Sequence, residues 1–591
     1  MMDLQRNNLD SSTSPYLRQH LDNPVWWQEW SAEVLAAAAA QGKPIFVSVG
    51  YSTCHWCHVM AAEAFSDAET ARLLNDRFLC IKVDRETRPD IDQYLMRFAQ
   101  EQNGNGGWPL NVFLTADLRP VLALTYAPPR PRQGMASLRL IAERVLEYIR
   151  EHDRDIGPFH FRDEAPAIAD PDRVADGVLA PFDHRHGGFG SEPKFPPHST
   201  LLYMLYALCA GAHPGLEHAC RLTLERMRRG GLHDHLQGGI FRYCVDREWT
   251  VPHFEKMLYD QAMALWWSAL AARVLGDDAQ ERMAEGIVRC LEETFALDGL
   301  FAAAFDADTG HREGATYLWG AGEIEAVLAP DEFSEFRRSY LLPAGGNFHG
   351  AVHLARLDDR PLQAVEEKLL SRRRQRPQPE RDDKLLCGTN ALAACALIQA
   401  ARLLERSAWE ERAAGIVRRL LEVFWDGRRL GHSLVAGSLQ EQEFLEDAAA
   451  LLLAVTMLRE GDDGWIGLMN ALSRHVSTFR RAGRWIGSRA TDFQEMDAPW
   501  FDHPIPSPVS LAVLGLARAA VLENGAPEAA EYRPPHQGDF FNIAVLFRRG
   551  LFHQVHAPRL IPWAKLPANS IQVRDAHESD CYDGACRPLP I

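Results

Sequence analysis

The sequence predicts a protein of two parts, a small α/β domain at the N-terminus followed by an all-α ring of six helical hairpins, an (α/α)6 toroid. Three observations predict this fold class. The chain of 591 residues is too long for one small module. Strand-like and helical runs alternate up to about residue 152, and helical windows then recur in pairs as far as about residue 531.

The first part of the chain alternates between two kinds of secondary-structure pattern. Short apolar runs rich in β-branched and aromatic residues predict strands at 44–50, 78–84, 109–114 and 120–125. Helical stretches separate or close them at about 54–76, 92–102 and 137–152. Strands that alternate with helices are typical of an α/β domain, which we place at residues 1–152.

The second part of the chain is built from repeated helix pairs. Residues 153–172 are rich in proline and charge and predict a linker before it. The clearest pairs are 255–275 with 278–296, 388–405 with 408–425, and 443–460 with 464–482. Each pair ends in a short segment that contains an aromatic residue and a glycine. A unit of helix, helix and turn therefore recurs about every 55 residues. Six such units predict a closed ring at 173–531, with an irregular insertion at about 310–380. Residues 532–591 form a short extension with one β-like run at 540–547.

Composition and charge exclude several classes of function. Lys and Arg number 63 against 80 Asp and Glu, a net charge of −17. Such a chain repels phosphate, so we expect no nucleic-acid partner and no binding to an anionic membrane. The sequence shows neither a secretory signal nor an apolar run long enough to span a bilayer, so we expect a cytoplasmic protein. Eleven cysteines, an odd number, do not suggest a disulfide scaffold.

One cysteine motif stands out near the N-terminus. Cys54-His55-Trp56-Cys57-His58 follows a predicted strand and opens a predicted helix. A C-x-x-C in this context indicates a thioredoxin-like redox site. The helix N-terminus stabilises a thiolate at Cys54, and the two histidines add positive charge nearby. Cys57, one turn later, is placed to resolve a mixed disulfide.

A second loop is expected beside the cysteine motif, and the motif also has alternative interpretations. Gly106-Gly-Trp108-Pro109 precedes the third strand, and we predict a cis bond between Trp108 and Pro109. The alternatives are c-type haem attachment, a Cys/His metal site and inert cysteines, but no second C-x-x-C completes four zinc ligands. We therefore expect neither a metal nor a cofactor. Cys581 and Cys586 are candidates for a second thiol pair.

Longer motifs carry a resemblance to a known family. The residues Gly50-Tyr-Ser-Thr-Cys-His-Trp-Cys-His-Val-Met60, Lys82-Val-Asp-Arg-Glu86 and Val251-Pro-His-Phe-Glu-Lys-Met-Leu-Tyr-Asp260 resemble those of the spermatogenesis-associated, YyaL-like thioredoxin-domain proteins. The resemblance covers nearly the whole chain. It implies an α/β thioredoxin-like N-terminal domain fused to a six-hairpin glycosidase-like (α/α)6 barrel. Thr389 and Pro508-Val509 depart from the family pattern within the barrel.

Polar clusters fall where we expect the inner helices of the ring to begin. Paired carboxylates in a cleft suit glycoside hydrolysis, whereas epimerisation favours His253 as a base. The alternative is that these groups only cap helices. The candidate catalytic residues of the ring are His253, Glu255, Asp260, Asp306, Asp308, Glu446 and Asp447. The candidate substrate-binding residues are Lys194, Trp249, Lys256, Tyr259 and Asn390.

Three functions follow from these patterns. The first is a thiol–disulfide oxidoreductase, with Cys54 as nucleophile and a thiol or disulfide protein or a small thiol as partner. The second is a carbohydrate-active enzyme, a hydrolase or an epimerase, that works in the ring. The third is a non-catalytic module that binds a sugar or a protein.

Overall fold

The computed structural model describes residues 3–132, 134–160, 171–211, 213–320, 322–502, 504–526 and 539–589. The chain forms two compact units. The first comprises Met1–Arg162, Ser433–Gln440 and Ala490–Met496, and the second comprises the rest. Residues 161–170 of the predicted linker lie outside the described residues.

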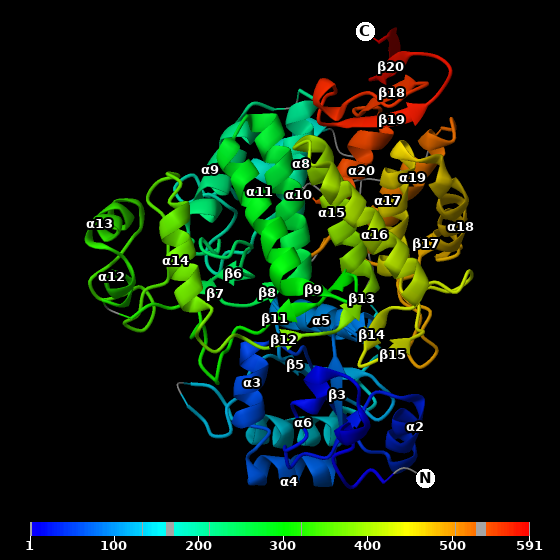
Figure 1. The fold of residues 1–591 in the computed structure, drawn as a ribbon. Helices are drawn as coiled ribbons and strands as arrows, with labels where there is room; N and C mark the ends of the chain where they lie inside the picture. The colour runs from blue at the N-terminus through cyan, green and yellow to red at the C-terminus, as the bar shows by residue number, and fades with distance from the viewer. Residues whose placement is uncertain are drawn as a thin grey trace. The chain divides into compact units, whose positions relative to one another are not determined.

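The first unit is built on a five-stranded sheet (Figure 1). Its strands are β1 (Trp27–Glu29), β2 (Ile45–Gly50), β3 (Leu79–Asp84), β4 (Leu110–Leu114) and β5 (Pro120–Leu124), in the order β1-β3-β2-β4-β5. The pairs β1–β3 and β2–β3 are parallel, and β2–β4 and β4–β5 are antiparallel. The four predicted strands are confirmed, whereas β1, with only three residues, was too short to predict.

Helices of the first unit follow the sequence signals closely. They are α1 (Pro15–Arg18), α2 (Ala32–Gln41), α3 (His55–Ala62), α4 (Ala68–Arg77), α5 (Pro89–Asn103) and α6 (Leu138–His152), with a 3-10 turn η1 (Leu9–Ser11) before them. The single helix predicted over 54–76 is wrong, because the chain breaks at Glu63 and restarts at Asp67. The Asp67 carboxylate accepts the backbone N–H of Thr70 at 2.9 Å and so caps α4.

Two later segments of the chain complete the first unit. Asp492 accepts a hydrogen bond from the Arg88 guanidinium at 2.8 Å, and its carbonyl accepts one from the Trp30 indole at 3.2 Å. Phe493 packs edge-on against Trp30 and Tyr94. Sequence patterns did not reveal this arrangement, because more than 400 residues separate Arg88 from Asp492.

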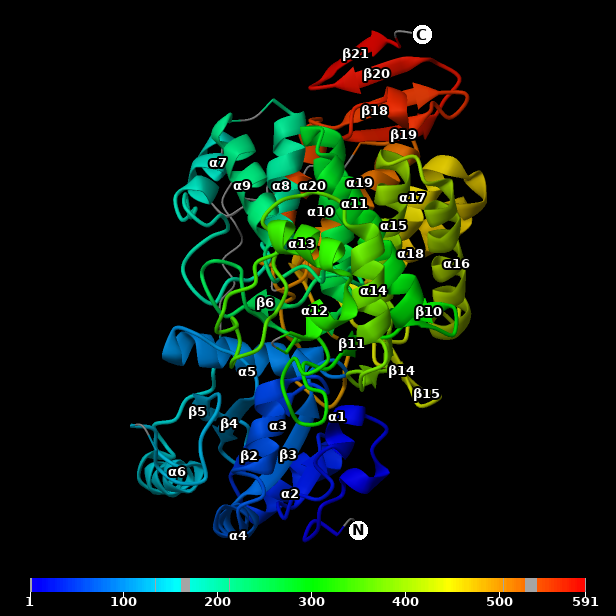
Figure 2. The ribbon, with the colours of Figure 1, turned by 60° about the vertical axis from the view of Figure 1, so that its left-hand side comes forward.

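A ring of helices forms the second unit (Figures 1 and 2). In the described part of the chain, the inner helices are α8 (His198–Cys209), α10 (Leu258–Leu275), α15 (Cys387–Leu403), α17 (Leu445–Gly461), α19 (Pro508–Leu522) and α20 (Phe540–Arg548). Each packs on the next in this order, and α20 packs back on α8 to close the ring. The outer helices are α9 (Gly215–Arg229), α11 (Asp278–Cys290), α16 (Ser407–Phe424) and α18 (Ile466–Ser477), with α7 (Pro171–Leu179) against α9. The predicted all-α (α/α)6 ring is confirmed.

Burial explains why the two sets of helices differ in sequence. Nearly every residue of α10 from Leu258 to Ala271 is buried, because outer helices and ring neighbours surround it. Helix α11 buries one face only and carries charged residues on the other. An apolar helix paired with an amphipathic one is therefore the repeat that the sequence showed.

Two predictions outside the repeats need correction. The run 540–547 is not β but the helix α20, whose buried residues Phe540, Phe541 and Phe547 lack the polar alternation of a surface strand. The insertion at about 310–380 is partly helical, with α12 (Glu323–Val327), α13 (Pro330–Ser339) and α14 (Gln363–Arg373) around their own apolar cluster.

Short strands and turns link the helices of the ring. They are β6 (Tyr243–Cys244), β7 (Pro252–His253), β8 (Lys256–Met257), β9 (Ala296–Leu297), β10 (Leu300–Phe301), β11 (Ala304–Phe305), β12 (Arg381–Asp382), β13 (Leu385–Leu386), β16 (Arg480–Arg481) and β17 (Arg484–Trp485), with η2 (Leu291–Phe295), η3 (Asp463–Trp465) and η4 (Trp563–Lys565). In the first unit, β14 (Ser433–Val435) and β15 (Ser438–Gln440) form a hairpin. The chain ends in a sheet of order β19-β18-β20-β21, made of β18 (His553–Ala557), β19 (Ser570–Arg574), β20 (Ser579–Tyr582) and β21 (Ala585–Pro588).

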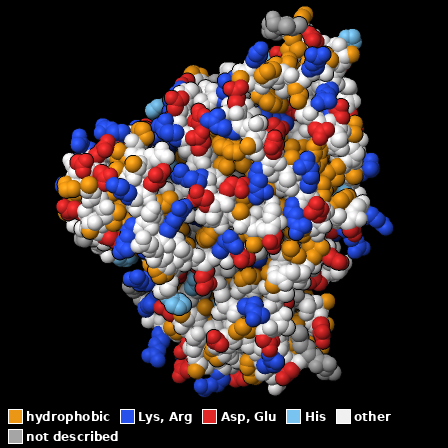
Figure 3. Space-filling model, in the orientation of Figure 1, with side chains coloured by type: hydrophobic (Ala, Val, Ile, Leu, Met, Phe, Trp, Pro, Cys, Tyr) orange, Lys and Arg blue, Asp and Glu red, His pale blue; other side chains and the backbone are white. Residues whose placement is uncertain are grey.

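The surface charge and the apolar character of the helices can be compared with the expected absence of nucleic-acid and membrane partners. Basic and acidic side chains are interspersed on the face shown in Figure 3, without a broad region of one sign. In the described part of the chain, no helix combines the length and the apolar character needed to cross a membrane.

Candidate functional site

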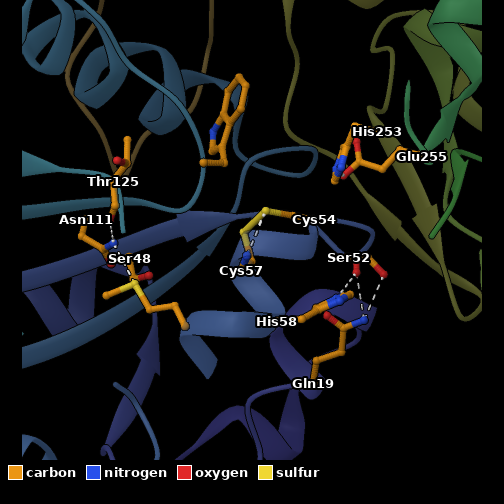
Figure 4. Close-up of a disulfide and its surroundings, with 12 residues drawn as sticks. Gln19, Ser48, Ser52, Cys54, Cys57, His58, Asn111, Thr125, His253 and Glu255 are labelled. Carbon is orange, nitrogen blue, oxygen red and sulfur yellow. Dashed lines mark hydrogen bonds and ion pairs between the residues drawn. A yellow bond between two sulfur atoms is a disulfide. The ribbon is translucent and has the colours of Figure 1, made fainter. Parts of the chain in front are cut away.

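The cysteine motif lies where strand β2 passes into helix α3 (Figure 4). Cys54 is the N-cap of α3, and its sulfur accepts the backbone N–H of Cys57 at 3.2 Å. Cys54 and Cys57 form a disulfide and are both buried. The sulfur of Cys54 therefore sits at the positive end of the helix, where a thiolate is favoured on reduction.

The histidines and the tryptophan of the motif have different roles. His58 Nε2 donates to the carbonyl of Ser52 at 2.8 Å, and Gln19 donates to the same carbonyl at 3.0 Å (Figure 4). His58 thus fixes the loop before Cys54. The ring of His55 lies edge-on to that of Trp56. Trp56 is 46% exposed.

The predicted cis bond between Trp108 and Pro109 is present. The indole of Trp108 donates to Asp92 Oδ1 at 2.7 Å and packs edge-on against Tyr51. The guanidinium of Arg85 lies 3.9 Å from its ring centroid. These contacts hold Trp108 beside the loop that carries the cysteines.

The remaining cysteines fall into two groups. Cys581 and Cys586 are cross-strand partners on β20 and β21 and form a disulfide, so the candidate second pair does come together. The seven others are free thiols, and all but Cys209 are buried. Burial raises the pKa of thiols such as Cys80 and Cys220, so these behave as apolar core residues.

In the ring, four charged side chains form a continuous array around His253. Glu313 Oε1 lies 2.6 Å from His253 Nδ1, and Glu255 Oε1 lies 3.2 Å from His253 Nε2. Arg242 donates to the other oxygen of Glu255 at 2.9 Å. The ring of Tyr243 stacks on the imidazole, 5.0 Å between centroids. The array therefore alternates in sign from Glu313 to Arg242.

The electrostatics of this array fix the charge of its imidazole. Burial alone would lower the pKa of His253, but Glu255 and Glu313 outweigh it and raise that pKa to about 9. Burial would raise the pKa of Glu255, but Arg242 and His253 lower it to about 2. His253 is consequently an imidazolium at neutral pH. A protonated imidazole can only donate, so this pairing favours His253 as an acid; its role as a base in epimerisation stays a prediction.

Asp260 belongs to a second chain of hydrogen-bonded side chains, with His198 and Trp267. His198 Nε2 lies 3.0 Å from Asp260 Oδ1, and His198 Nδ1 accepts the indole N–H of Trp267 at 3.0 Å. Because the indole can only donate, the imidazole proton is on Nε2 and points at Asp260. Burial raises the pKa of Asp260. Neither His198 nor Trp267 was predicted, since no motif marks them.

Other predicted residues of the ring are held in structural contacts. Asn390 bonds both backbone groups of Phe301, and Asp447 accepts the N–H of Gly388 at 2.7 Å and His432 Nδ1 at 2.7 Å. The predicted substrate-binding residues Lys194 and Trp249 are also buried: the ammonium of Lys194 lies 2.8 Å from Asp183, and the indole of Trp249 donates to the carbonyl of His186 at 3.1 Å.

Lys256 occupies a buried ionic network that sequence reasoning missed. Asp234 accepts Lys256 Nζ at 2.7 Å and the Arg373 guanidinium at 2.8 and 2.9 Å. Burial would raise the pKa of Asp234, but the two cations hold it well below its usual value. Lys256 also lines a pocket of about 530 Å³, together with Phe305, Tyr317 and Arg381 among others.

The other candidates of the ring lie in turns and at the starts of helices. Asp306 accepts the backbone N–H of Asp308 at 2.8 Å in a turn, and Tyr259 is buried on α10. Ligand atoms of His432, Glu446 and Asp447 lie within 4.8 Å of one another. Each oxygen of Asp447 already accepts one hydrogen bond, from Gly388 and from His432.

The fold and the cysteine site define a thioredoxin-like domain joined to a ring of helical hairpins. The family model Thioredox_DsbH, described as "Protein of unknown function, DUF255", matches residues 6–160. An uncharacterized protein of Caenorhabditis elegans, B0495.5, is 32% identical over 522 residues, 77% of this chain and 71% of that protein. Spermatogenesis-associated protein 20 of Rattus norvegicus is 31% identical over 535 residues, 78% of this chain and 68% of that protein.

The family model covers the first part of the chain, whereas these two relatives match more than three quarters of it. The chain belongs to the spermatogenesis-associated protein 20 family. The solved structure of cellobiose 2-epimerase from Spirochaeta thermophila is similar at 14% identity with a TM-score of 0.41, covering 63% of this chain and 81% of that one. The ring itself is defined by its own helix contacts.

Proposed function

We propose that the protein is a thiol–disulfide oxidoreductase, with Cys54 as nucleophile and Cys57 as resolving cysteine. The observation that supports it is the position of Cys54, at the N-cap of α3, with its sulfur on the N–H of Cys57 and its partner in a disulfide. In the reduced form the thiolate of Cys54 attacks one sulfur of a substrate disulfide and displaces the other. Cys57 then attacks Cys54, so the site is oxidised and the substrate reduced.

The test is reduction of insulin by dithiothreitol, with a matched pair of cysteine variants. Cys54→Ser should lower the rate at least about a hundredfold, because serine cannot form the mixed disulfide. Cys209→Ser removes the partly exposed free thiol of the ring and should leave the rate unchanged. Equal rates for wild type and Cys54→Ser, with no Cys54–Cys57 couple in glutathione buffers, would reject the proposal.

A second function is favoured for the ring by the array around His253. We infer that it is a carbohydrate site in which the imidazolium of His253 donates a proton or a hydrogen bond, and a carboxylate such as Glu313 accepts one. Glu313 supports this role because its side chain is 22% exposed, whereas Glu255 is fully buried. An acid next to a carboxylate is the pairing that acid–base chemistry on sugars uses.

A screen of mono- and disaccharides tests the ring. Wild type should bind or convert at least one sugar, and Glu313→Gln should abolish that effect. Glu293→Gln removes an exposed carboxylate that pairs only with Arg374 among the contacts described, and is the matched control. Binding without conversion would assign the ring to a non-catalytic module. No binding of any sugar would reject a carbohydrate site.

We propose a cytoplasmic location as well. All eleven cysteines lie in the described part of the chain, and seven of them are free thiols, which fits a reducing compartment. Fractionation of the native host should place the protein with cytoplasmic markers, and recovery with secreted or periplasmic markers would contradict this.

A further inference from the structure

A pocket of about 530 Å³ lies in the second unit and is used by neither of the functions proposed above. Its described lining residues include three cations, Lys256, Arg374 and Arg381, and the carboxylate of Asp383. Tyr317 adds an aromatic ring and a hydroxyl to the same lining. Cavities of several hundred Å³ that combine aromatic and polar side chains are typical of small-molecule sites, so the pocket has room for a ligand of that kind.

The extended segment from β7 to β8 separates this pocket from the array around His253. His253 and Glu255 contact each other at 3.2 Å within the array. The residues that alternate with them contact Tyr317 instead: the ring of Phe254 stacks on it with centroids 5.7 Å apart, and Lys256 Nζ lies 5.5 Å from its centroid. Successive side chains of an extended chain point to opposite sides, so the pocket and the array lie on opposite sides of this segment.

The two arginines of the pocket have hydrogen-bond donors to spare. Arg374 donates from Nη2 to Glu293 at 2.6 Å, and Arg381 donates from Nε to Asp383 at 2.5 Å and from Nη1 to the Thr294 carbonyl at 3.0 Å. A guanidinium carries five N–H groups. Among the described residues, Nε and Nη1 of Arg374 and Nη2 of Arg381 have no hydrogen-bond acceptor. Each arginine can therefore bind an anion without breaking its present ion pair.

Two buried side chains of the pocket also have polar groups without partners. Tyr317 is 5% exposed, and its hydroxyl makes no hydrogen bond within the described parts of the chain. Lys256 is 2% exposed, and its Nζ donates to Asp234 at 2.7 Å and to the Gly238 carbonyl at 3.1 Å, which uses two of its three N–H groups. The side-chain amide of Gln237, also in the lining, has no partner among the residues described. Buried polar groups are normally satisfied, so unused ones around a cavity point to a polar ligand.

The charge around the pocket decides which kind of polar ligand fits. Its ion pairs join four cations to three carboxylates, which leaves one positive charge in excess. The cations are Lys256, Arg373, Arg374 and Arg381, and the carboxylates are Asp234, Glu293 and Asp383. One negative charge balances this excess, whereas the second charge of a phosphate dianion would not be compensated. A carboxylate also matches the planar guanidinium groups of the two arginines.

We propose that this pocket binds a small hydroxylated carboxylic acid, a ligand of the sugar-acid type. The carboxylate of the ligand pairs with the unused N–H groups of Arg374 and Arg381. Its hydroxyl groups bond the Tyr317 hydroxyl and the Gln237 amide, which can each donate and accept. The inference goes beyond the oxidoreductase and the acid–base array, and it requires neither of them to be active.

The experiment is isothermal titration calorimetry of the full-length protein with sodium gluconate, at low salt and pH 7. Wild type should bind gluconate with a Kd of about 1 mM or below, and should bind neither glucose nor glucose 6-phosphate as tightly. Arg374→Gln should weaken gluconate binding about tenfold, because a charge-assisted hydrogen bond is lost. Tyr317→Phe should weaken it severalfold, and it removes a hydroxyl that has no partner in the described structure, so the fold does not depend on it.

Arg372 offers a matched control, because its side chain is 50% exposed against 51% for Arg374 and it is not among the described residues that line the pocket. Arg372→Gln should bind gluconate as wild type does. An equal loss in Arg372→Gln and Arg374→Gln would show an effect of surface charge alone and would overturn the inference.

The remaining outcomes separate this pocket from the functions proposed above. No binding of gluconate to wild type overturns the inference, and so does glucose or glucose 6-phosphate binding as tightly as gluconate. Undiminished binding in both Arg374→Gln and Tyr317→Phe overturns it as well. Glu313→Gln should retain gluconate binding, which supports the pocket even where the sugar screen or the insulin assay rejects the other proposals. Loss of gluconate binding in Glu313→Gln would place the acid at the array and overturn the inference.

Discussion

The array around His253 gives a prediction whose size can be worked out from the structure. Replacing Glu255 by glutamine should remove most of the effect that keeps His253 protonated. Burial alone lowers the pKa of His253, and the charge of Glu255 is the largest influence that raises it to about 9. From an ordinary value of about 6.5, this rise corresponds to about 3 kcal/mol in favour of the imidazolium.

The sign of this linkage follows from the direction of the shift. The folded-state pKa lies above the unfolded value, so the stabilisation is fully present below about pH 6.5 and is lost as the pH rises through about 9. In Glu255→Gln the pKa should fall by at least about one unit, and Arg242 should lower it further because its own partner is gone. Glu313→Gln should give a smaller fall, since Glu313 is partly exposed.

Hydrogen–deuterium exchange at the imidazole C2 position, read by mass spectrometry, measures the pKa of each histidine in a protein of this size. Burial lowers the pKa of His233 and of His353 to about 4, and these two serve as internal references. Neither should move in Glu255→Gln. If His253 titrates at or below pH 6.5 in wild type, the reasoning about the array is refuted.

Three further predictions concern other contacts. Asp234→Asn should cost about 3–5 kcal/mol in urea unfolding, because it leaves two buried cations without their shared carboxylate; a loss below about 1 kcal/mol would contradict the network. Cys581 and Cys586 should be alkylated after mild reduction while the ring stays folded by circular dichroism, because β21 is exposed; alkylation only on global unfolding would count against this. Gly50→Ala should destabilise the first unit by about 1–3 kcal/mol in thermal unfolding, since its Cβ would overlap the Tyr16 side chain and Cys57 Sγ; a stability equal to wild type would show that the site has room.

Local patterns predicted the fold better than they predicted the sites. The strand before Cys54 and the helix after it are encoded by neighbouring residues, so the position of the Cys54–Cys57 motif in the fold could be predicted from the sequence. The ionic network around Asp234 could not, because Arg373 and Asp234 are 139 residues apart and no spacing links them. Helix α20 was predicted as a β-like run, because a helix buried by its neighbours on several sides shows no polar periodicity.

The predicted polar residues at the starts of the inner helices differ in what they leave available to a ligand. Asn390 uses its donor and acceptor groups on backbone, and both oxygens of Asp447 are hydrogen-bonded. Such hydrogen bonds satisfy backbone groups and give these side chains a structural role. Glu313 and His253 are different, because they form an ion pair and the Glu313 side chain is partly exposed. The raised pKa of His253 keeps its imidazole protonated at neutral pH. A sugar at the proposed site could therefore contact Glu313 without breaking the hydrogen bonds of a helix cap, and for this reason Glu313→Gln is the variant that tests the proposal.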